Sequence, residues 1–241
     1  MTITDRAVLV TGANRGIGQA LVEEALRRGA RRVYAGTRQP LVHPDTRVTP
    51  LLLDVTNAAQ IRAAVERVDT LDLLINNAGV ARFDDLSDRA VLEQHLAVNL
   101  FGAYGMTQAC LPLLTRSHGA IVNVLSLTAV APLPFVPAYS ISKAAAFSLS
   151  QSLRAVLAGQ GVRAHAVLAG AVDTEMSRDF AVPKAPPESV ARAILDGVAN
   201  GEEEIFPDPM SAPLAAPWRG GALKALEREF AALANATPEA A

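Results

Sequence analysis

The sequence contains a single cysteine, Cys110, and few aromatic residues among its 241 positions. One cysteine cannot form a disulfide within the chain, and we interpret this lone thiol as a core or helix residue rather than a catalytic one. Because aromatic residues make up only 5% of the chain, its core has to be built from Val, Leu, Ile and Ala. That composition is typical of parallel strands covered by helices.

Strong charge and long hydrophobic runs are also missing. The formal net charge is −2, which does not favour capture of nucleic acid or of an anionic membrane. No apolar run approaches the roughly 20 residues needed to span a bilayer. Met1 to Arg6 lacks the basic and hydrophobic segments of a signal peptide. We therefore expect a cytoplasmic protein with no nucleic-acid partner, no membrane partner and no metal.

Short apolar runs alternate with segments of helical periodicity along the chain. Strands are expected at residues 7–11, 32–36, 49–53, 71–75, 120–125, 162–168 and 204–206. Helices are expected at residues 16–28, 57–68, 88–113 (bent or divided near 99–105), 137–158, 188–199 and 222–234. Repeated strand–helix–strand units predict an α/β fold, a Rossmann-type doubly wound sheet of about seven parallel strands with helices on both faces.

We expect residues 1–241 to form a single domain, because no linker or internal repeat is evident. Pro183 to Pro187 is too short to separate domains, so we interpret it as the hinge of a short substrate lid at about residues 175–187. From about residue 207 the chain becomes a tail rich in Pro and Ala.

A glycine-rich turn, Thr11-Gly12-Ala13-Asn14-Arg15-Gly16-Ile17-Gly18, joins the first strand to the first helix. Glycines let the backbone approach a pyrophosphate, and the helix N-terminus supplies N–H donors and a positive dipole end. Tight packing between strand and helix is the alternative explanation. The spacing differs from the commoner G-x-G-x-x-G, and the missing Gly-Lys-Ser/Thr disfavours nucleotide hydrolysis.

The end of the second strand indicates which dinucleotide would bind. An acidic residue there would hold the ribose 2′-hydroxyl, but Thr37 occupies that place and Arg38 follows. An arginine favours a 2′-phosphate through charge-assisted hydrogen bonds, and Arg15 in the glycine turn is a second candidate. Unless both are solvated surface arginines, the sequence predicts NADP(H) over NAD(H).

Tyr139 and Lys143, four residues apart at the start of the second long helix, lie on one helical face. An ammonium beside a phenol is expected to lower the phenol pKa from about 10 toward working pH. Such a phenol suits a general acid for carbonyl reduction or a general base for alcohol oxidation. The pair alone is a weak signal, because it arises by chance on many exposed helices.

Together with the glycine turn, the pair makes this sequence resemble the short-chain dehydrogenase/reductase family over about residues 5–206. The motifs follow the family's order: Thr11 to Gly18, Asp54, Asn76 to Gly79, Asn99, Ser126, and then Tyr139 and Lys143.

This resemblance implies a catalytic set of Asn99, Ser126, Tyr139 and Lys143. Ser126 would hydrogen-bond the substrate carbonyl, although the family's frequent Ser-Ser is Leu125-Ser126 here. Asn99 would interrupt its helix and fix a water that links Lys143 to solvent, unless it is an ordinary interior asparagine. Lys143 would also bind the nicotinamide ribose.

The resemblance further implies a set of cofactor-binding positions. Asp54 and Val55 would meet the adenine ring, although Asp54 also suits a cap at the strand end. Residues 76–79 would support the sheet as much as contact the cofactor. After the sixth strand the family's Pro-Gly is Ala169-Gly170 here, and Thr174 would contact the carboxamide. The full set is Gly12, Asn14, Arg15, Gly16, Ile17, Gly18, Thr37, Arg38, Asp54, Val55, Asn77, Ala78, Gly79, Tyr139, Lys143, Gly170, Val172 and Thr174.

The expected function is interconversion of a ketone or aldehyde and its alcohol with NADP(H). Apolar residues in three segments, 81–83, 127–137 and 175–187, indicate an apolar substrate, unless some of them pack the lid or a subunit contact. Members of the family commonly pair through the two long helices, so a homodimer or homotetramer is expected. A non-catalytic NADP(H)-sensing regulator and a non-redox lyase or isomerase on the same fold remain as alternatives.

Overall fold

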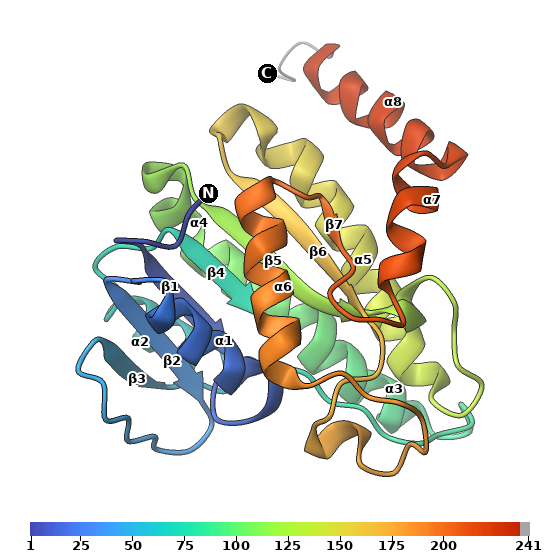
Figure 1. The fold of residues 1–241 in the computed structure, drawn as a ribbon, viewed down its shortest axis with the longest axis horizontal. Coiled ribbons are helices and arrows are strands. Elements are labelled where there is room, and N and C mark those ends of the chain that lie inside the picture. The colour runs from blue at the N-terminus through green and yellow to red at the C-terminus, as the bar shows by residue number, and fades with distance from the viewer. Residues whose placement is uncertain (237–241) are drawn as a thin grey trace.

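A computed structural model describes residues 1–236 and shows one seven-stranded sheet in which every pair of neighbouring strands is parallel (Figure 1). The strands are β1 (Ala7–Thr11), β2 (Arg32–Thr37), β3 (Val48–Leu52), β4 (Leu73–Asn76), β5 (Ala120–Ser126), β6 (Arg163–Ala169) and β7 (Glu204–Ile205). Their order in space is β3-β2-β1-β4-β5-β6-β7. The predicted doubly wound α/β fold is confirmed.

Helices cover both faces of this sheet. They are α1 (Gly16–Arg27), α2 (Ala58–Val65), α3 (Arg89–Leu96), α4 (Ala103–Ser117), α5 (Pro137–Leu157), α6 (Pro187–Asn200), α7 (Ala215–Arg219) and α8 (Ala222–Ala236). One face is covered by α1 and α6, which pack against each other, and the other by α2, α4 and α5 (Figure 1). The predicted terminal helix at 222–234 is present as α8.

The side chains of β1 show why both faces need helices. Val8 and Val10 join the core cluster shared with α1 and α6, whereas Ala7 and Leu9 join the cluster shared with α2, α4 and α5. All of β1 is buried. Side chains alternate between the two faces of a strand, so a strand that is apolar at every position is buried on both sides.

The strand order reverses between β1 and β4, because the chain runs outward through β2 and β3 and then starts again on the other side of β1. In open α/β sheets, ligands bind beyond the carboxyl ends of the strands at such a reversal. The loops that leave the carboxyl edge of the sheet include residues 12–15, 38–47, 53–57, 77–88, 127–136 and 170–186. They contain most of the residues that the sequence singles out.

Two predicted elements differ in detail from the structure. The long helix at 88–113 consists of α3, a π-helix (Ala97–Gly102) and α4, so the division falls slightly before the predicted bend. Strand β4 begins at Leu73 rather than Leu71. The Asp72 carboxylate accepts a hydrogen bond from the Ala7 N–H at 2.8 Å. At the start of β1, a side chain of the segment before β4 therefore takes the place of a backbone hydrogen bond between the two strands.

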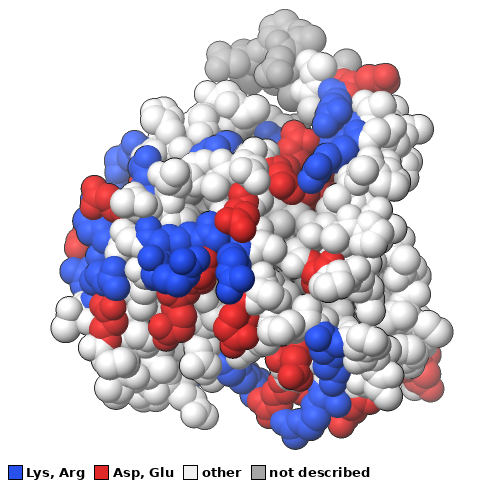
Figure 2. Space-filling view, in the orientation of Figure 1, with Lys and Arg blue, Asp and Glu red and all other residues white. Residues whose placement is uncertain are grey.

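Charged side chains of both signs lie side by side on the α1 and α6 face (Figure 2). The buried Glu24 carboxylate in α1 pairs with Arg27 at 2.5 Å and with Arg28 at 2.6 Å, and Arg28 also pairs with Asp196 in α6 at 2.9 Å. Basic groups on this face are thus neutralised locally by carboxylates. Over the described residues, every helix is too short or too polar to cross a membrane.

Candidate active site

Neighbouring elements bring Ser126, Tyr139 and Lys143 together. Ser126 ends β5, and Tyr139 and Lys143 lie in the first two turns of α5, which starts at Pro137. Proline fits this first helical position because its missing N–H would have no partner there. The Lys143 Nζ lies 5.6 Å from the centre of the Tyr139 ring, and the Ser126 side chain is near enough to Tyr139 to act on its pKa. The motif spacing therefore corresponds to a compact group of polar side chains.

The side chain of Lys143 is bound to the backbone of the sheet. Its Nζ donates a hydrogen bond to the Val124 carbonyl of β5 at 2.9 Å, and the residue is buried. Burial lowers the pKa of Lys143 to about 8, because desolvation disfavours the charged form. A Cβ on Gly79 would stand 3.6 Å from this Nζ, so the predicted segment 76–79 lies directly beside the lysine.

The prediction that Lys143 lowers the pKa of Tyr139 is wrong for this structure. Burial raises the pKa of Tyr139 to about 12, and the side chain of Ser126 acts in the opposite direction without cancelling that effect. The ammonium of Lys143 is directed to the Val124 carbonyl instead. At neutral pH Tyr139 is therefore a protonated phenol, which is the state that a proton donor needs.

Asn99 interrupts the long helix as predicted, because it lies in the π-helix between α3 and α4. Its Nδ2 donates to the Val80 carbonyl at 3.0 Å and its Oδ1 accepts from the Val80 N–H at 2.9 Å. The same Nδ2 donates to Ser142 Oγ at 2.9 Å, and this hydroxyl donates to the Tyr139 carbonyl at 2.7 Å. Asn99 thus joins the loop after β4 to the helix that carries Tyr139.

His95, which the sequence analysis did not single out, also borders this group. Its ring is fully buried and meets the Tyr139 ring edge-on, with 6.3 Å between the ring centres. Its Nδ1 lies 2.7 Å from the Val91 carbonyl, and its Nε2 accepts from the Arg82 N–H at 3.2 Å. In the sequence, only the position of His95, four residues before Asn99 and so on the same helical face, could have indicated that it lies near the site. We assign His95 a positioning role behind Tyr139.

The glycine turn packs tightly against the end of β4. Gly12 and Gly16 have positive φ angles of +66° and +54°. A Cβ on Gly18 would stand 2.1 Å from the Gly12 carbonyl oxygen and 2.5 Å from the Asn77 Nδ2. That amide donates to the carbonyls of Thr11 at 2.9 Å and Gly12 at 3.2 Å. The alternative of tight strand-to-helix packing therefore holds for Gly18, whatever else the turn does.

The first turn of α1 has no cap. Its N-cap residue, Arg15, forms no side-chain cap, and the turn contains no acidic residue. By contrast, Asn57 caps α2 and Asp88 caps α3 through their side-chain oxygens. The N–H groups at the start of a helix need an acceptor from outside the helix. The turn at α1 thus presents donors and a positive dipole end at the carboxyl edge of the sheet.

The end of β2 offers one unpaired cation. Arg38 is exposed and makes no ion pair or hydrogen bond with any described side chain, while its charge helps to lower the pKa of Asp54 after the hydrogen bonds from Thr56. Thr37 is buried and donates to the Gln39 carbonyl at 2.6 Å.

Three other predicted cofactor positions differ in exposure. Val55 is buried in the core beside α2, Ile17 packs against the core beside α1, and Asn14 is exposed.

Asp54 caps its own turn, as the alternative explanation predicts. Its Oδ1 accepts from the Thr56 N–H at 2.9 Å and from the Thr56 hydroxyl at 2.7 Å. Ala78 is fixed in a similar way, because its N–H donates to the Thr11 hydroxyl at 3.0 Å. These contacts give both residues a structural role beside any contact with a ligand.

The residues after β6 are held by a partner that the sequence did not reveal. The Gly170 N–H donates to Asp208 Oδ2 at 2.7 Å, and a Cβ on Gly170 would stand 2.6 Å from the other oxygen of that carboxylate. Gly170 is therefore engaged by the tail, not open to a ligand through its N–H. Val172 is buried and pairs with Ala185 in an isolated parallel bridge, which closes the base of the predicted lid. Thr174 lies against Gly16, where a Cβ would meet its methyl group at 3.0 Å.

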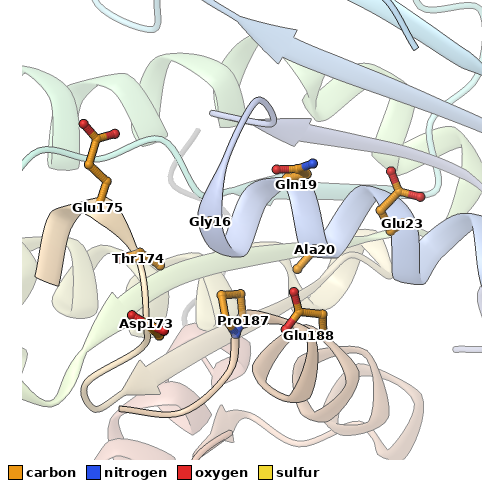
Figure 3. Close-up of a pocket in the computed structure, with 9 residues that line it drawn as sticks. All are labelled: Gly16, Gln19, Ala20, Glu23, Asp173, Thr174, Glu175, Pro187 and Glu188. Carbon is orange, nitrogen blue, oxygen red and sulfur yellow. The ribbon is translucent and has the colours of Figure 1, made fainter. Parts of the chain in front are cut away.

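A cavity of about 410 Å³ lies between α1, beginning at Gly16 of the glycine turn, residues 173–175 and the start of α6 (Figure 3). Four carboxylates line it: Glu23, Asp173, Glu175 and Glu188. Such a lining disfavours a phosphate group inside this cavity. The described residues contain no group of three or more His, Cys, Asp or Glu arranged to hold a metal ion.

Comparisons with known proteins agree with this geometry. The family described as short chain dehydrogenase matches residues 6–184. Oxidoreductase UcpA of Escherichia coli is 33% identical over 231 residues, which cover 85% of this chain and 88% of that protein. Short-chain dehydrogenase PC-15 of Penicillium crustosum is 40% identical over 185 residues, or 70% of this chain and 66% of that protein.

One solved structure is similar to this one over almost the whole chain. It is a short chain dehydrogenase from Burkholderia cenocepacia in complex with NADP, with 38% sequence identity and a TM-score of 0.87. The match covers 95% of this chain and 98% of that one. The chain therefore belongs to the short-chain dehydrogenase family, a family of oxidoreductases with a Rossmann-like fold.

Proposed function

We propose that this protein is an NADP(H)-dependent oxidoreductase that interconverts a ketone or aldehyde, of apolar character, and the corresponding alcohol. The observation that carries the proposal is the group of Ser126, Tyr139 and Lys143 at the carboxyl end of β5. This group lies at the same sheet edge as the uncapped first turn of α1. A hydride carrier and a proton donor would therefore meet at one edge of the sheet.

The residues at this edge fit a phosphorylated dinucleotide. The uncapped N–H groups of α1 suit a pyrophosphate, and Arg38, which has no described partner, suits a 2′-phosphate. That the Burkholderia relative binds NADP supports the choice. Asp54 and Val55 would border the adenine, and Lys143 and Thr174 the nicotinamide end. When bound, the nicotinamide supplies or accepts the hydride.

Tyr139 would act on the substrate oxygen. With its pKa near 12 the phenol keeps its proton at neutral pH, and it can pass that proton to an oxygen that becomes an alkoxide. Ser126, which lies beside Tyr139, would donate a second hydrogen bond to the same oxygen. Donors held at the place where negative charge develops lower the barrier without reorganising.

Lys143 and Asn99 would support this proton transfer. The Lys143 Nζ lies 5.6 Å from the centre of the Tyr139 ring. Its charge would partly offset the phenolate left after proton transfer, while desolvation keeps the pKa of Tyr139 above its ordinary value. Asn99 holds the backbone of Val80 and the Ser142 hydroxyl, which fixes the loop after β4 against α5. We propose that a water bound at Asn99 returns the proton to Lys143 and Tyr139.

The first test is a panel of ketones and aldehydes, monitored through the absorbance of NADPH and run beside NADH. We expect consumption of NADPH with at least one apolar carbonyl compound. Tyr139→Phe should lower kcat by about 10²- to 10⁴-fold, the usual contribution of general acid catalysis, with the Kd for NADPH nearly unchanged. Binding of NADPH without turnover of any carbonyl would instead support the regulatory alternative. Near wild-type kcat in Tyr139→Phe would contradict the mechanism.

We also propose a homodimer or homotetramer that pairs through the long helices. Phe101, Tyr104, Ile141 and Val156 are exposed apolar or aromatic side chains on the π-helix, α4 and α5. Sedimentation equilibrium tests this, and a monomer at micromolar concentration would contradict it.

A further inference from the structure

Three phenylalanine rings contact one another at the carboxyl edge of the sheet. Phe83 and Phe180 have 5.4 Å between their ring centres, Phe135 and Phe180 have 5.7 Å, and Phe83 and Phe135 have 6.0 Å. The rings are tilted by 40° to 48°. The chain has only seven phenylalanines, and this cluster takes three of them.

The three rings come from different loops that share one edge of the sheet. Phe83 follows β4, Phe135 follows β5 just before the helix of Tyr139, and Phe180 belongs to the lid after β6. Phe83 is 59% exposed and Phe135 is 42% exposed. An aromatic cluster that leaves this much ring surface open is not part of the core, and contiguous exposed apolar surface marks a binding site.

Two of the rings are fixed to the frame of the active site. The Asp84 N–H donates to the Phe135 carbonyl at 3.3 Å, and its carboxylate accepts from the Ala138 N–H, also at 3.3 Å. On the other side of Phe83, the Arg82 N–H donates to His95. His95 meets Tyr139 edge-on, and Ala138 directly precedes Tyr139. Phe83 and Phe135 therefore keep a set position relative to Tyr139.

The third ring belongs to a differently held segment. The Phe180 N–H donates to the Ser177 carbonyl within the lid at 3.0 Å. The contacts of its ring with Phe83 and Phe135 join the lid to the frame of the active site. A flat ring from a substrate can replace these ring–ring contacts with contacts of the same kind.

We infer that Phe83, Phe135 and Phe180 form an aromatic clamp that binds an aryl group of the substrate. The favoured substrates are then aryl ketones, aryl aldehydes and the matching benzylic alcohols. Tilted aromatic rings attract a further ring through the contact of positive edges with negative faces, beyond the area that they bury. A saturated ring of similar size fills the same space without this attraction. The inference rests on the proposed function and adds the substrate class to it.

The test compares 1-phenylethanol with 1-cyclohexylethanol as ligands of the NADPH-bound protein. Neither alcohol can react with NADPH, so calorimetry gives a Kd that does not depend on turnover. We expect the phenyl compound to bind about two- to tenfold tighter, the range that an aromatic contact provides. Phe83→Leu, Phe135→Leu and Phe180→Leu should each bring this ratio toward one. Phe230→Leu, an exposed phenylalanine of α8 outside the cluster, is the matched control and should leave it unchanged.

Equal binding of the two alcohols, no detectable binding of either, or a preference that survives all three leucine variants would overturn the clamp. A parallel assay with acetophenone and cyclohexyl methyl ketone separates this outcome from failure of the proposed function. Consumption of NADPH with both ketones but no preference for the aryl compound leaves the function intact and removes the clamp. A preference for 1-phenylethanol that the leucine variants abolish, without turnover of either ketone, supports the clamp and contradicts the reductase activity.

Discussion

Arg15 in the glycine turn forms an ion pair with Glu175 in the lid. Glu175 also pairs with Arg178 at 3.1 Å. Arg15 was the second candidate for binding the 2′-phosphate of NADP(H). In this structure the Glu175 carboxylate pairs with the guanidinium to which that phosphate would bind. Because both side chains are more than half exposed, the pair is worth only about 0.2–1 kcal/mol and a doubly charged phosphate can displace it.

Glu175→Gln should therefore lower the KM for NADPH. The substitution removes the competing carboxylate from Arg15, and we expect up to about a fivefold decrease, which corresponds to 1 kcal/mol. The KM for NADH should stay the same, because NADH has no 2′-phosphate. Steady-state kinetics with both cofactors check this. Arg178→Gln is the control, because it removes the second partner of Glu175 and leaves Arg15 paired. An equal decrease for NADH would show that Glu175 affects something other than phosphate binding.

Arg38→Gln should reduce the preference for NADPH more strongly. Arg38 has no described partner that it would have to leave, and a hydrogen bond to a charged group contributes about 1.5–3 kcal/mol. The kcat/KM for NADPH should fall by about 10- to 100-fold, and the value for NADH should change little. Arg116→Gln, at an exposed arginine near the end of α4, provides the control at the opposite edge of the sheet. If both cofactors lost efficiency equally, the 2′-phosphate assignment would be wrong.

The pH dependence should follow Lys143. Its pKa is lowered to about 8 by burial, so Lys143 is charged below that pH and loses its proton as the pH rises through it. The pKa of Tyr139 is raised to about 12, so the phenol keeps its proton across this range. The kcat/KM for NADPH, which reports the protein before NADPH binds, should be constant below about pH 7 and should decline above pH 8.

A pH–rate profile from pH 6 to 10 measures this decline. Lys143→Met should have low efficiency and no such inflection, whereas Arg38→Gln should keep the inflection because it acts at the other end of the cofactor. A wild-type profile that stays flat to pH 10 would contradict the assignment to Lys143.

The fold and most of the site could be predicted because they depend on local sequence signals. Apolar runs such as Ala7–Thr11 set the strands, and the glycine turn, Ser126 and the pair of Tyr139 and Lys143 lie at fixed spacings. Contacts between segments far apart in the sequence had no such signal. The bond from Gly170 to Asp208 spans 38 residues and the pair of Arg15 and Glu175 spans 160.

The pKa of Tyr139 was mispredicted for a related reason. The spacing of Tyr139 and Lys143 shows that the two side chains are near each other, but it does not show how deeply they are buried. Desolvation is the main cause of both shifts, because it raises the pKa of Tyr139 and lowers that of Lys143. The sequence therefore indicates that Tyr139 and Lys143 are neighbours, whereas the direction of each pKa shift depends on burial, which only the three-dimensional structure shows.

The tail is the place where a single charge should matter most for stability. Lys224 of α8 is 1% exposed and its Nζ lies 2.9 Å from Glu204 of β7 and 3.0 Å from Glu227. Lys224 also pairs with Glu203 at 2.8 Å, and Arg154 pairs with both Glu204 and Glu227. Lys224→Met therefore leaves Glu204 and Glu227 with a second cation, whereas a buried charge left wholly without compensation would cost about 3–5 kcal/mol. Lys224→Met should therefore lower the free energy of unfolding by less than that amount but by more than the loss of an exposed pair, measured by denaturant titration.

Lys224→Met combined with Glu204→Gln should recover part of the loss, because the double variant removes a buried carboxylate that has lost one of its two cations. Arg89→Met serves as the control, since it breaks an exposed pair with Glu93 and should cost less than about 1 kcal/mol. A loss of that small size in Lys224→Met would mean that Arg154 by itself compensates Glu204 and Glu227, and it would contradict the prediction for Lys224.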